Sequence, residues 1–253
     1  MGSVAAVRRS VEGTLASPRS VTTKTGWDEL AKRVLDVTAA LVLLLVFAPL
    51  FVLCALAIKL ESRGPVFYPC RRVGRYHAEF AMLKFRKMRD GAGGPRLTGG
   101  HDERFTRVGR ILARSKLDEL PQLLNVVRGE MSIVGPRPED ELFVGVAPAD
   151  FTPILSVRPG ITGLSQLAFA CESEILDRAT DPHEIYVNRL LPQKIALDRL
   201  YAEERTLGMD LRILFWTTVA VVMRRQVAVN RESGRLGRRR RPGPGAMGSL
   251  EIG

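Results

Sequence analysis

One stretch of the chain, residues 116–139, decides how the rest is interpreted, and it reads KLDELPQLLNVVRGEMSIVGPRPE. Two adjacent acids, Asp118 and Glu119, open a short amphipathic run whose apolar residues recur at helical spacing. The run ends in Pro136-Arg137-Pro138, where two prolines restrict the backbone on both sides of one permanent positive charge. A pair of acids followed by a rigidly held arginine favours phosphate chemistry.

The two acids are weak evidence by themselves, since charged residues usually lie on solvated helix surfaces. Neighbouring residues of a helix point about 100° apart, so one acid can attack while the other holds a metal ion or a proton. A carboxylate is a legitimate nucleophile toward phosphorus, and an anionic pyrophosphate needs cations to neutralise it. Most single arginines are surface charges, but the candidates for neutralising the pyrophosphate are Lys84, Arg86, Arg104, Arg114, Arg137 and Arg158.

A second feature is a 22-residue apolar stretch from Val37 to Ile58, broken near its middle by Ala48 and Pro49. A helix of that length can cross a bilayer. Proline lacks an amide hydrogen and clashes with the preceding turn, so the two halves could instead form a V that enters and leaves by one leaflet. Basic residues on both flanks favour the V, because a straight span would export one of them. The residues alone leave both topologies open.

The 253 residues carry a net charge of +11, from 38 Lys and Arg against 27 Asp and Glu. Much of the excess lies in residues 224–241, where eight arginines accompany one acid. Such a block favours an anionic surface, either nucleic acid or the phospholipid of a cytoplasmic leaflet. The three cysteines, Cys54, Cys70 and Cys171, lack the spacing of a metal site and indicate a reducing setting for the soluble part.

Periodicity and helix breakers divide the chain into four segments. We expect a flexible leader over 1–26, an interfacial and membrane helix over 27–63, a cytosolic domain at the membrane surface over 64–225, and a basic disordered tail over 226–253. Inside the third segment the pattern predicts strands near residues 66–68 and 80–83 and helices over 104–117, 120–127 and, in two pieces, 181–223. The predicted fold class is α+β, predominantly helical with short strands.

An ordered series of motifs over residues 30–225 resembles the bacterial sugar transferases, which are small monotopic polyprenyl-phosphate phosphoglycosyl transferases. The series runs through Lys32-Arg33 with Asp36, Gly64-Pro65-Val66-Phe67, Lys84 to Met88, Leu117 to Gln122, Gly129 to Pro138, Val157 to Gly163, and Asp198 with Tyr201 and Asp210. A single match of this kind is weak evidence, whereas the ordered series is specific.

The resemblance implies transfer of a phosphosugar from a nucleotide diphosphate sugar, expected to be a UDP-sugar, to undecaprenyl phosphate with release of UMP. It assigns the nucleophile to Asp118, through a covalent aspartyl-phosphosugar intermediate. Glu119 would assist through Mg²⁺ or a proton, and Asp198 matches a further functional acid, so these three acids are the expected Mg²⁺ ligands. The motif at residues 136–138 matches the one associated with the nucleotide end of the donor.

The resemblance also implies a re-entrant helix in the cytoplasmic (inner) membrane, with the catalytic domain facing the cytosol. A polyprenyl phosphate stays in the phospholipid membrane and a sugar nucleotide stays in water, so the reaction belongs at the interface between them. Its product would begin a lipid-linked glycan for polysaccharide or glycoconjugate synthesis. Two positions depart from the family pattern: Ala113 replaces a frequent arginine, with Arg114 next to it, and Ala48-Pro49 replaces Ser-Pro.

Two other classes of function are open on the residues. A membrane-tethered nucleic-acid binder suits the charge, but the chain lacks an aromatic stacking motif or a groove-reading unit, so no nucleic-acid partner is expected. A non-catalytic scaffold of a glycan assembly complex could carry the same residues without turnover. The sequence identifies neither the sugar nor the pathway, and a homodimer is one possible form.

Overall fold

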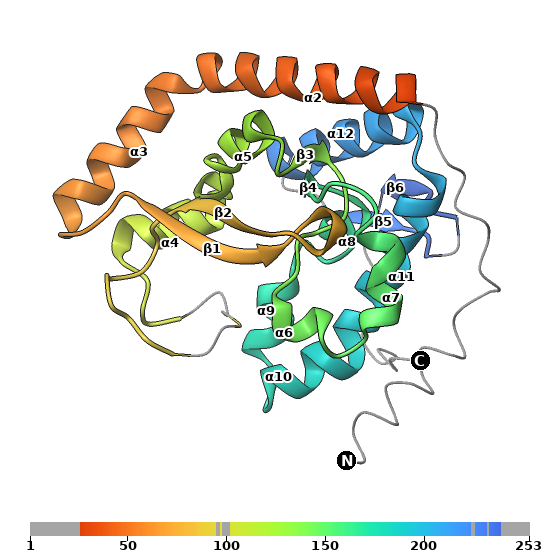
Figure 1. The fold of residues 1–253 in the computed structure, drawn as a ribbon. Helices are drawn as coiled ribbons and strands as arrows, with labels where there is room; N and C mark the ends of the chain where they lie inside the picture. The colour runs from red at the N-terminus through yellow and green to blue at the C-terminus, as the bar shows by residue number, and fades with distance from the viewer. Residues whose placement is uncertain (1–25, 95–96, 98–101, 224–225, 232, 239–253) are drawn as a thin grey trace.

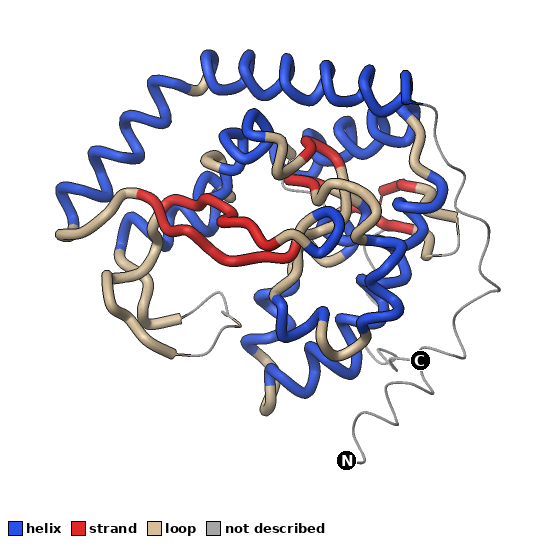
Figure 2. Tube along the Cα trace, in the orientation of Figure 1, coloured by secondary structure: helices blue, strands red, loops and turns tan. Residues whose placement is uncertain are grey.

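The computed structural model describes residues 26–94, 97, 102–223, 226–231 and 233–238. A long bent pair of helices, α2 and α3, runs over one side of a body built from shorter helices and small two-stranded sheets (Figure 1). Helices prevail over strands in the described part of the chain (Figure 2). The predicted class, mostly helical with short strands, is confirmed.

The elements of the fold are short apart from four helices. The helices are α2 (Gly26–Val46), α3 (Ala48–Glu61), α4 (Arg107–Ser115), α5 (Gln122–Arg128), α6 (Glu141–Val144), α7 (Pro148–Ile154), α8 (Leu164–Ala168), α9 (Glu172–Asp177), α10 (Pro182–Ile185), α11 (Leu191–Glu204) and α12 (Leu207–Val222). Tighter or wider turns are η1 (Arg75–His77), η2 (Leu117–Glu119) and η3 (Tyr186–Leu190). The strands are β1 (Phe67–Val73), β2 (Glu79–Phe85), β3 (Ser132–Val134), β4 (Gly160–Thr162), β5 (Val227–Val229) and β6 (Leu236–Arg238).

Each strand has one partner. β1 pairs with β2 and β5 with β6 in antiparallel hairpins, whereas β3 and β4 are parallel, with Ser132 opposite Gly160. β3 is buried along its whole length, in a core that includes Leu164, Leu197 and Ile213 from α8, α11 and α12. The loop that leaves β3 therefore starts from a fixed point in the middle of the protein.

α2 and α3 meet at Phe47 with a bend of 63°. Pro49 lies in the first turn of α3, where a missing amide hydrogen costs nothing because the first amides of a helix have no partner in that helix. The predicted break in the apolar stretch is confirmed. Among the described residues no single helix is long and apolar enough to cross a membrane, and this bent pair meets those criteria by length and composition. Its re-entrant path through a bilayer stays a prediction.

The bent pair exposes large apolar side chains on its outer surface. Leu45 of α2 is 78% exposed and Leu60 of α3 is 87% exposed. On the inner side, Cys54 and Ile58 of α3 are buried against Phe85 in a small core cluster. The inner contacts fix α3 on the body, and the outer surface is the kind of apolar patch that marks an interaction site.

The end of the described chain differs from its prediction. We predicted a disordered tail from residue 226, whereas β5 and β6 form a hairpin there. Val227 is buried in the core, and Gly234, at φ 60, lies close to Leu164 and Met209. This hairpin left little sign in the sequence, because arginines dominate the composition of the segment and its apolar residues are few. Residues 239–253 of the predicted tail and 1–25 of the predicted leader lie outside the described residues.

Candidate active site

The two acids lie in a break between two helices. α4 ends at Ser115, the backbone of the next residue, Lys116, adopts the left-handed conformation (φ 62), and α5 begins at Gln122. Between them, η2 carries Asp118 and Glu119 on a turn of the 3₁₀ type, in which successive side chains point about 120° apart. Asp118 is therefore buried, at 3% exposure, while Glu119 is half-buried.

Strand β2 and the residues that follow it bring two lysines to these acids. Lys84 Nζ lies 3.3 Å from Glu119 Oε1, and Lys87 Nζ lies 3.7 Å from Asp118 Oδ2. The buried Asn125 of α5 fixes the strand, because it accepts from the Leu83 amide (2.9 Å) and donates to the carbonyl of Ala81 (2.8 Å). Lys84 was predicted, but Lys87 and Asn125 were missed. The available signal was that Lys87 lies three residues after Lys84. Because β2 ends at Phe85, between them, both lysines can reach the acids.

The environment separates the pKa values of the two acids. Burial, together with the charge of Glu119, raises the pKa of Asp118 despite the opposing effect of Lys84. For Glu119, burial is outweighed by Lys84, Arg137 and Lys116, which lower its pKa to about 2. Glu119 is thus a permanent anion at neutral pH, while Asp118 is the more basic carboxylate. Paired acids whose pKa values are pushed apart are typical of sites in which the two have different roles.

The loop after β3 carries Arg137, whose positive charge acts on Glu119. The Gly135 amide donates to the Thr162 carbonyl (2.9 Å), and the Pro136 carbonyl accepts from the Gly160 amide (2.8 Å). A side chain at Gly135 would overlap the carbonyl of Arg158, so the close approach requires glycine. Burial would lower the pKa of the half-buried Arg137, but Glu119, Glu172 and Glu139 outweigh it and raise that pKa. The predicted arginine therefore lies among carboxylates, with Glu119 exerting the largest effect of the three.

A second charged group includes Glu139, two residues after Arg137. It has four largely buried members, Lys194, Glu139, Glu172 and Tyr186, and we call it the Lys194 group. Lys194 Nζ is 3.1 Å from Glu139 Oε1 and 3.0 Å from Glu172 Oε2, with only 2% of its side chain exposed. The Tyr186 hydroxyl donates to Glu139 Oε1 at 2.8 Å. This group was not predicted from the sequence, although Glu139 directly follows the Pro136–Pro138 motif.

Asp198 lies four residues beyond Lys194 on α11 and supports the same loop. Burial raises its pKa to about 7, against the lowering effects of the Ser165 side chain, Lys194 and the Arg137 amide. Its Oδ1 atom is buried and has no hydrogen-bond partner among the described residues. The described residues contain no group of three or more Asp, Glu, His or Cys side chains placed to hold a metal ion. The structure therefore does not bring Asp198 together with the dyad as the predicted three-ligand set.

Three of the other predicted basic residues have different surroundings. The Arg86 guanidinium donates to the carbonyls of Ser62 and Arg63, which ties the end of α3 to the body. Arg104 forms an ion pair with Asp102 at 2.6 Å. Arg114 is exposed in the last turn of α4, directly after Ala113. Arg86 and Arg104 are thus engaged by groups other than the two acids.

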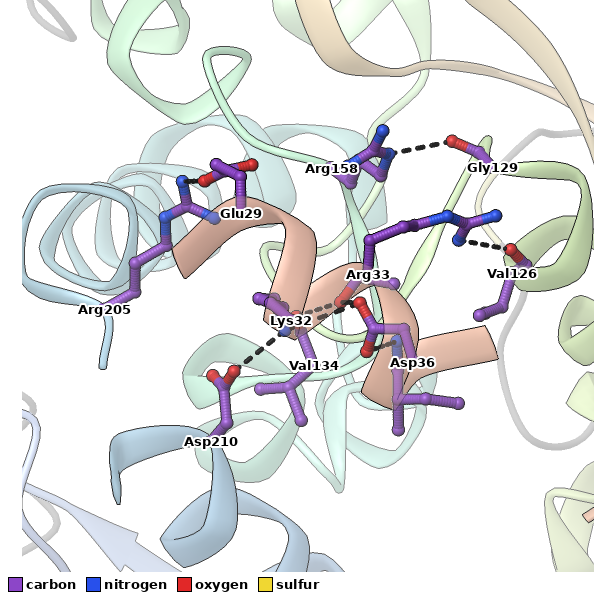
Figure 3. Close-up of polar contacts among 12 residues, drawn as sticks. Glu29, Lys32, Arg33, Asp36, Val126, Gly129, Val134, Arg158, Arg205 and Asp210 are labelled. Atoms are coloured by element: carbon purple, nitrogen blue, oxygen red, sulfur yellow. Dashed lines mark hydrogen bonds and ion pairs between the residues drawn. The ribbon is translucent and has the colours of Figure 1, made fainter. Parts of the chain in front are cut away.

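Arg158 lies at a second polar region, shown in Figure 3. Its Nε donates to the Gly129 carbonyl at 3.0 Å, while Arg33 donates to the Val126 carbonyl at 2.7 Å. Both cations lie at the carboxyl end of α5, where the partial negative charge of the helix end favours them. Arg158 is thus occupied at the end of α5 rather than at the dyad.

The same view shows how α2 is fastened to the body (Figure 3). Asp36 accepts from the Ser132 hydroxyl (2.7 Å) and from the Ile133 amide (3.1 Å) at the start of β3. Lys32 donates to Asp210 Oδ2 at 2.8 Å, and the other oxygen of Asp210 accepts from the Tyr201 hydroxyl at 2.6 Å. The side chains of Lys32, Asp36, Ser132, Tyr201 and Asp210 form what we call the α2 clamp, and all five belong to the motif series of the sequence.

Comparisons with known proteins show the family to which the chain belongs. A family model described as bacterial sugar transferase matches residues 27–224. The UDP-glucose:undecaprenyl-phosphate glucose-1-phosphate transferase of Caulobacter vibrioides is 42% identical over 200 residues, which cover 77% of this chain and 70% of that protein. The undecaprenyl-phosphate glucose phosphotransferase of Komagataeibacter xylinus is 39% identical over 200 residues, covering 76% and 36%. The exopolysaccharide production protein ExoY of Rhizobium meliloti is 39% identical over 215 residues, covering 78% and 87%.

The chain therefore belongs to the bacterial sugar transferase family and is an enzyme of the phosphoglycosyl transferase class. The resemblance seen in the motif series is confirmed.

Proposed function

We propose that this protein transfers a sugar 1-phosphate from a UDP-sugar to undecaprenyl phosphate, with release of UMP, and so begins a lipid-linked glycan for exopolysaccharide or a related product. The observation that carries the proposal is the acid pair with separated pKa values, placed among Lys84, Lys87 and Arg137. The names of the relatives, which combine undecaprenyl phosphate, UDP-glucose and exopolysaccharide production, support the choice of substrates.

In the first step of the proposed reaction, an Asp118 oxygen attacks the phosphorus that carries the sugar. The bond from this phosphorus to the bridging oxygen breaks, and UMP leaves with both bonding electrons. Asp118 then carries the phosphosugar as an acyl phosphate. Its raised pKa suits this role, because a more basic carboxylate is the better nucleophile once it is ionised. Cations near the dyad offset the repulsion between two anions.

In the second step, a phosphate oxygen of undecaprenyl phosphate attacks the same phosphorus. The bond to Asp118 breaks, which restores the carboxylate and yields undecaprenyl diphosphate sugar. Glu119, with its pKa lowered to about 2, does not exchange a proton at neutral pH and acts as a fixed negative charge. We therefore favour the metal-holding over the proton-transferring form of its predicted role.

We also propose Mg²⁺ as the cofactor. Magnesium is commonly held by one or two carboxylates together with substrate phosphates, and the Asp118–Glu119 pair beside Arg137 offers such a donor set without a third protein ligand. When bound, the ion would neutralise charge on the diphosphate. Lys84 and Arg137 provide the fixed positive charge that orients the donor.

We place the enzyme at the cytoplasmic membrane, with α2 and α3 as a re-entrant pair and the dyad on the cytosolic side. The apolar outer surface of the pair supports this placement, and α12 adds exposed Leu211, Phe215 and Val222. Burial of such side chains in hydrocarbon is favourable by roughly 1.5–3 kcal/mol each. A lipid acceptor and a soluble donor can meet only at such an interface.

The direct test is UMP release by the purified full chain in detergent or nanodiscs, with undecaprenyl phosphate, Mg²⁺ and a panel of UDP-sugars. We expect at least one donor to give UMP and a lipid-linked sugar in equal amounts. Reactions without the lipid serve as the control and should stop after at most one UMP per protein. Absence of UMP from every donor would contradict the proposal.

A further inference from the structure

The negative charges of two sets of carboxylates act on Arg137. Glu119 belongs to the acid pair, whereas Glu172 and Glu139 belong to the Lys194 group, and all three raise the pKa of Arg137. If donor phosphate is to bind the Arg137 guanidinium, the latter two must not hold it. The buried Lys194 is placed to prevent that, because it contacts both of them.

The contacts of Lys194 are close and largely closed to water. Its Nζ lies 3.1 Å from Glu139, 3.0 Å from Glu172 and 2.9 Å from the Tyr186 hydroxyl. Lys194 and Glu139 are 2% and 8% exposed, whereas Glu172 is 22% exposed and is the member that reaches solvent. A charged amine this deeply buried is expensive unless opposing charges surround it, so the ammonium and the two carboxylates depend on one another.

The backbone couples this group to the loop. Glu139 is the second residue after Arg137, and its carbonyl accepts from the Val73 amide at 3.0 Å. Its side chain is held by Lys194 and Tyr186 in the same place. Pro136 and Pro138 stiffen the segment between these anchors, so the position of Glu139 determines where the Arg137 side chain starts.

We propose that Lys194 is a positioning residue for Arg137: by binding Glu139 and Glu172, it leaves the Arg137 guanidinium to face the donor phosphate. This inference rests on the proposed function. It makes Lys194 a determinant of donor binding, although it touches neither substrate nor the acid pair. Without Lys194, the two carboxylates would bind Arg137 and withdraw it from the donor.

The test uses Lys194→Met in the full chain, with donor KM, kcat, the KM for undecaprenyl phosphate, and the equilibrium affinity for UMP as readouts. We expect donor KM and the UMP dissociation constant to rise roughly tenfold or more, the loss typical of one charge-assisted contact. The KM for undecaprenyl phosphate should stay within about threefold, which is the variation expected of an indirect effect on a separate substrate. An unchanged donor KM and UMP affinity would overturn the proposal.

A second variant separates positioning from a general loss of folding. In Lys194→Met/Glu139→Gln/Glu172→Gln the amide at position 139 keeps an acceptor for Tyr186, and both charges that would capture Arg137 are removed, so donor KM and UMP affinity should return most of the way to wild type. Failure of this rescue, with equal losses for donor and acceptor, would also overturn the proposal. Arg199→Met is the matched control, since Arg199 lies on the same helix and pairs with Glu203 one turn further on, at 2.7 Å.

Measurement of UMP affinity keeps the two proposals apart. If the wild type binds UMP in a manner that depends on Lys194 but transfers no sugar, the proposed function fails and the positioning role stands. If the wild type releases UMP and Lys194→Met behaves like wild type, the positioning role fails and the proposed function stands.

Discussion

The acid pair and the α2 clamp both contain carboxylates close to lysines, but the carboxylates differ in how completely they are hydrogen-bonded. In the clamp, Asp36 and Asp210 each accept short hydrogen bonds from partners on other elements, between 2.6 and 3.1 Å. At the acid pair, Lys87 lies 3.7 Å from Asp118, beyond hydrogen-bond distance, and Glu119 has Lys84 at 3.3 Å. Asp198, which supports the Arg137 loop, also has one buried oxygen that lacks a hydrogen-bond partner among the described residues.

The contrast separates charges that hold the fold from charges available to a ligand. Buried polar groups in a folded protein are nearly always paired, because leaving one unpaired is costly. A closed network such as the clamp therefore stabilises the arrangement of α2 on the body. Incompletely paired buried acids are tolerated where a substrate or cation completes them, and perturbed pKa values tend to cluster at such places. Three substitutions sharpen this distinction.

The largest effect is expected from Asp118→Asn. The amide cannot form the proposed acyl phosphate, so UMP release and sugar transfer should fall by about 10³-fold or more, as for loss of a nucleophile. Mass spectrometry of the wild type, incubated with donor but without lipid, should show one phosphosugar on residue 118. The melting temperature should not fall, because a neutral amide suits a buried site that disfavours the charge. A variant that retains transfer would contradict the assignment.

Much of this site could be predicted from the sequence because its main residues are close to one another along the chain. Asp118, Glu119 and Arg137 lie within one short stretch; the structure places the two acids on one turn, where the charge of Arg137 acts on Glu119. The break in the apolar run was likewise predictable, since Pro49 can enter a helix without strain only in its first turn.

The rest depended on contacts between distant segments. Arg158 appeared in a motif of the series but lies at the end of α5, and Arg86 is occupied by carbonyls that follow α3. Lys194 was missed because its partners, Glu139 and Glu172, are far away in sequence. The type of a charged residue indicates that it needs a partner, but not where the fold places that partner.

The second effect in size is expected from Asp36→Ala in the clamp. It leaves the Ser132 hydroxyl, the Ile133 amide and the Lys32 ammonium without their shared acceptor, and removal of one member of a buried charged group costs roughly 3–5 kcal/mol. Thermal unfolding in nanodiscs should show this loss. The remaining folded protein should keep its donor KM, because pairing with β4 and the surrounding core also hold β3, from which the Arg137 loop starts.

The matched control for the clamp is Glu29→Ala. Glu29 also lies on α2 and pairs with Arg205, but 27% of its side chain is exposed. Pairs that solvent can reach are screened and contribute less than closed buried networks, so this half-buried pair should cost clearly less stability than Asp36→Ala. Equal losses from Asp36→Ala and Glu29→Ala would remove the basis for treating the clamp as a closed buried network.

The smallest effect, and the one that changes with pH, is expected from Asp198→Asn. Folding raises the pKa of Asp198 from its usual 3.8 to about 7, so the folded chain binds this proton more tightly than the unfolded chain. The cost of ionising it is absent below pH 3.8, grows as the pH rises, and is complete above about pH 7. Between about pH 5 and pH 8 the wild type should therefore lose on the order of 2–3 kcal/mol that the variant does not lose.

Free energies of unfolding measured at about pH 5 and about pH 8 check this dependence. The stability of Asp198→Asn relative to wild type should be higher at about pH 8 than at about pH 5. Asp210→Asn should instead be less stable than wild type at both values, because it removes the carboxylate that pairs with the partly buried Lys32 ammonium. If Asp198→Asn also falls below wild type by the same amount at both, Asp198 is held like the acids of the clamp. The distinction between charges that hold the fold and charges left for a ligand then does not extend to it.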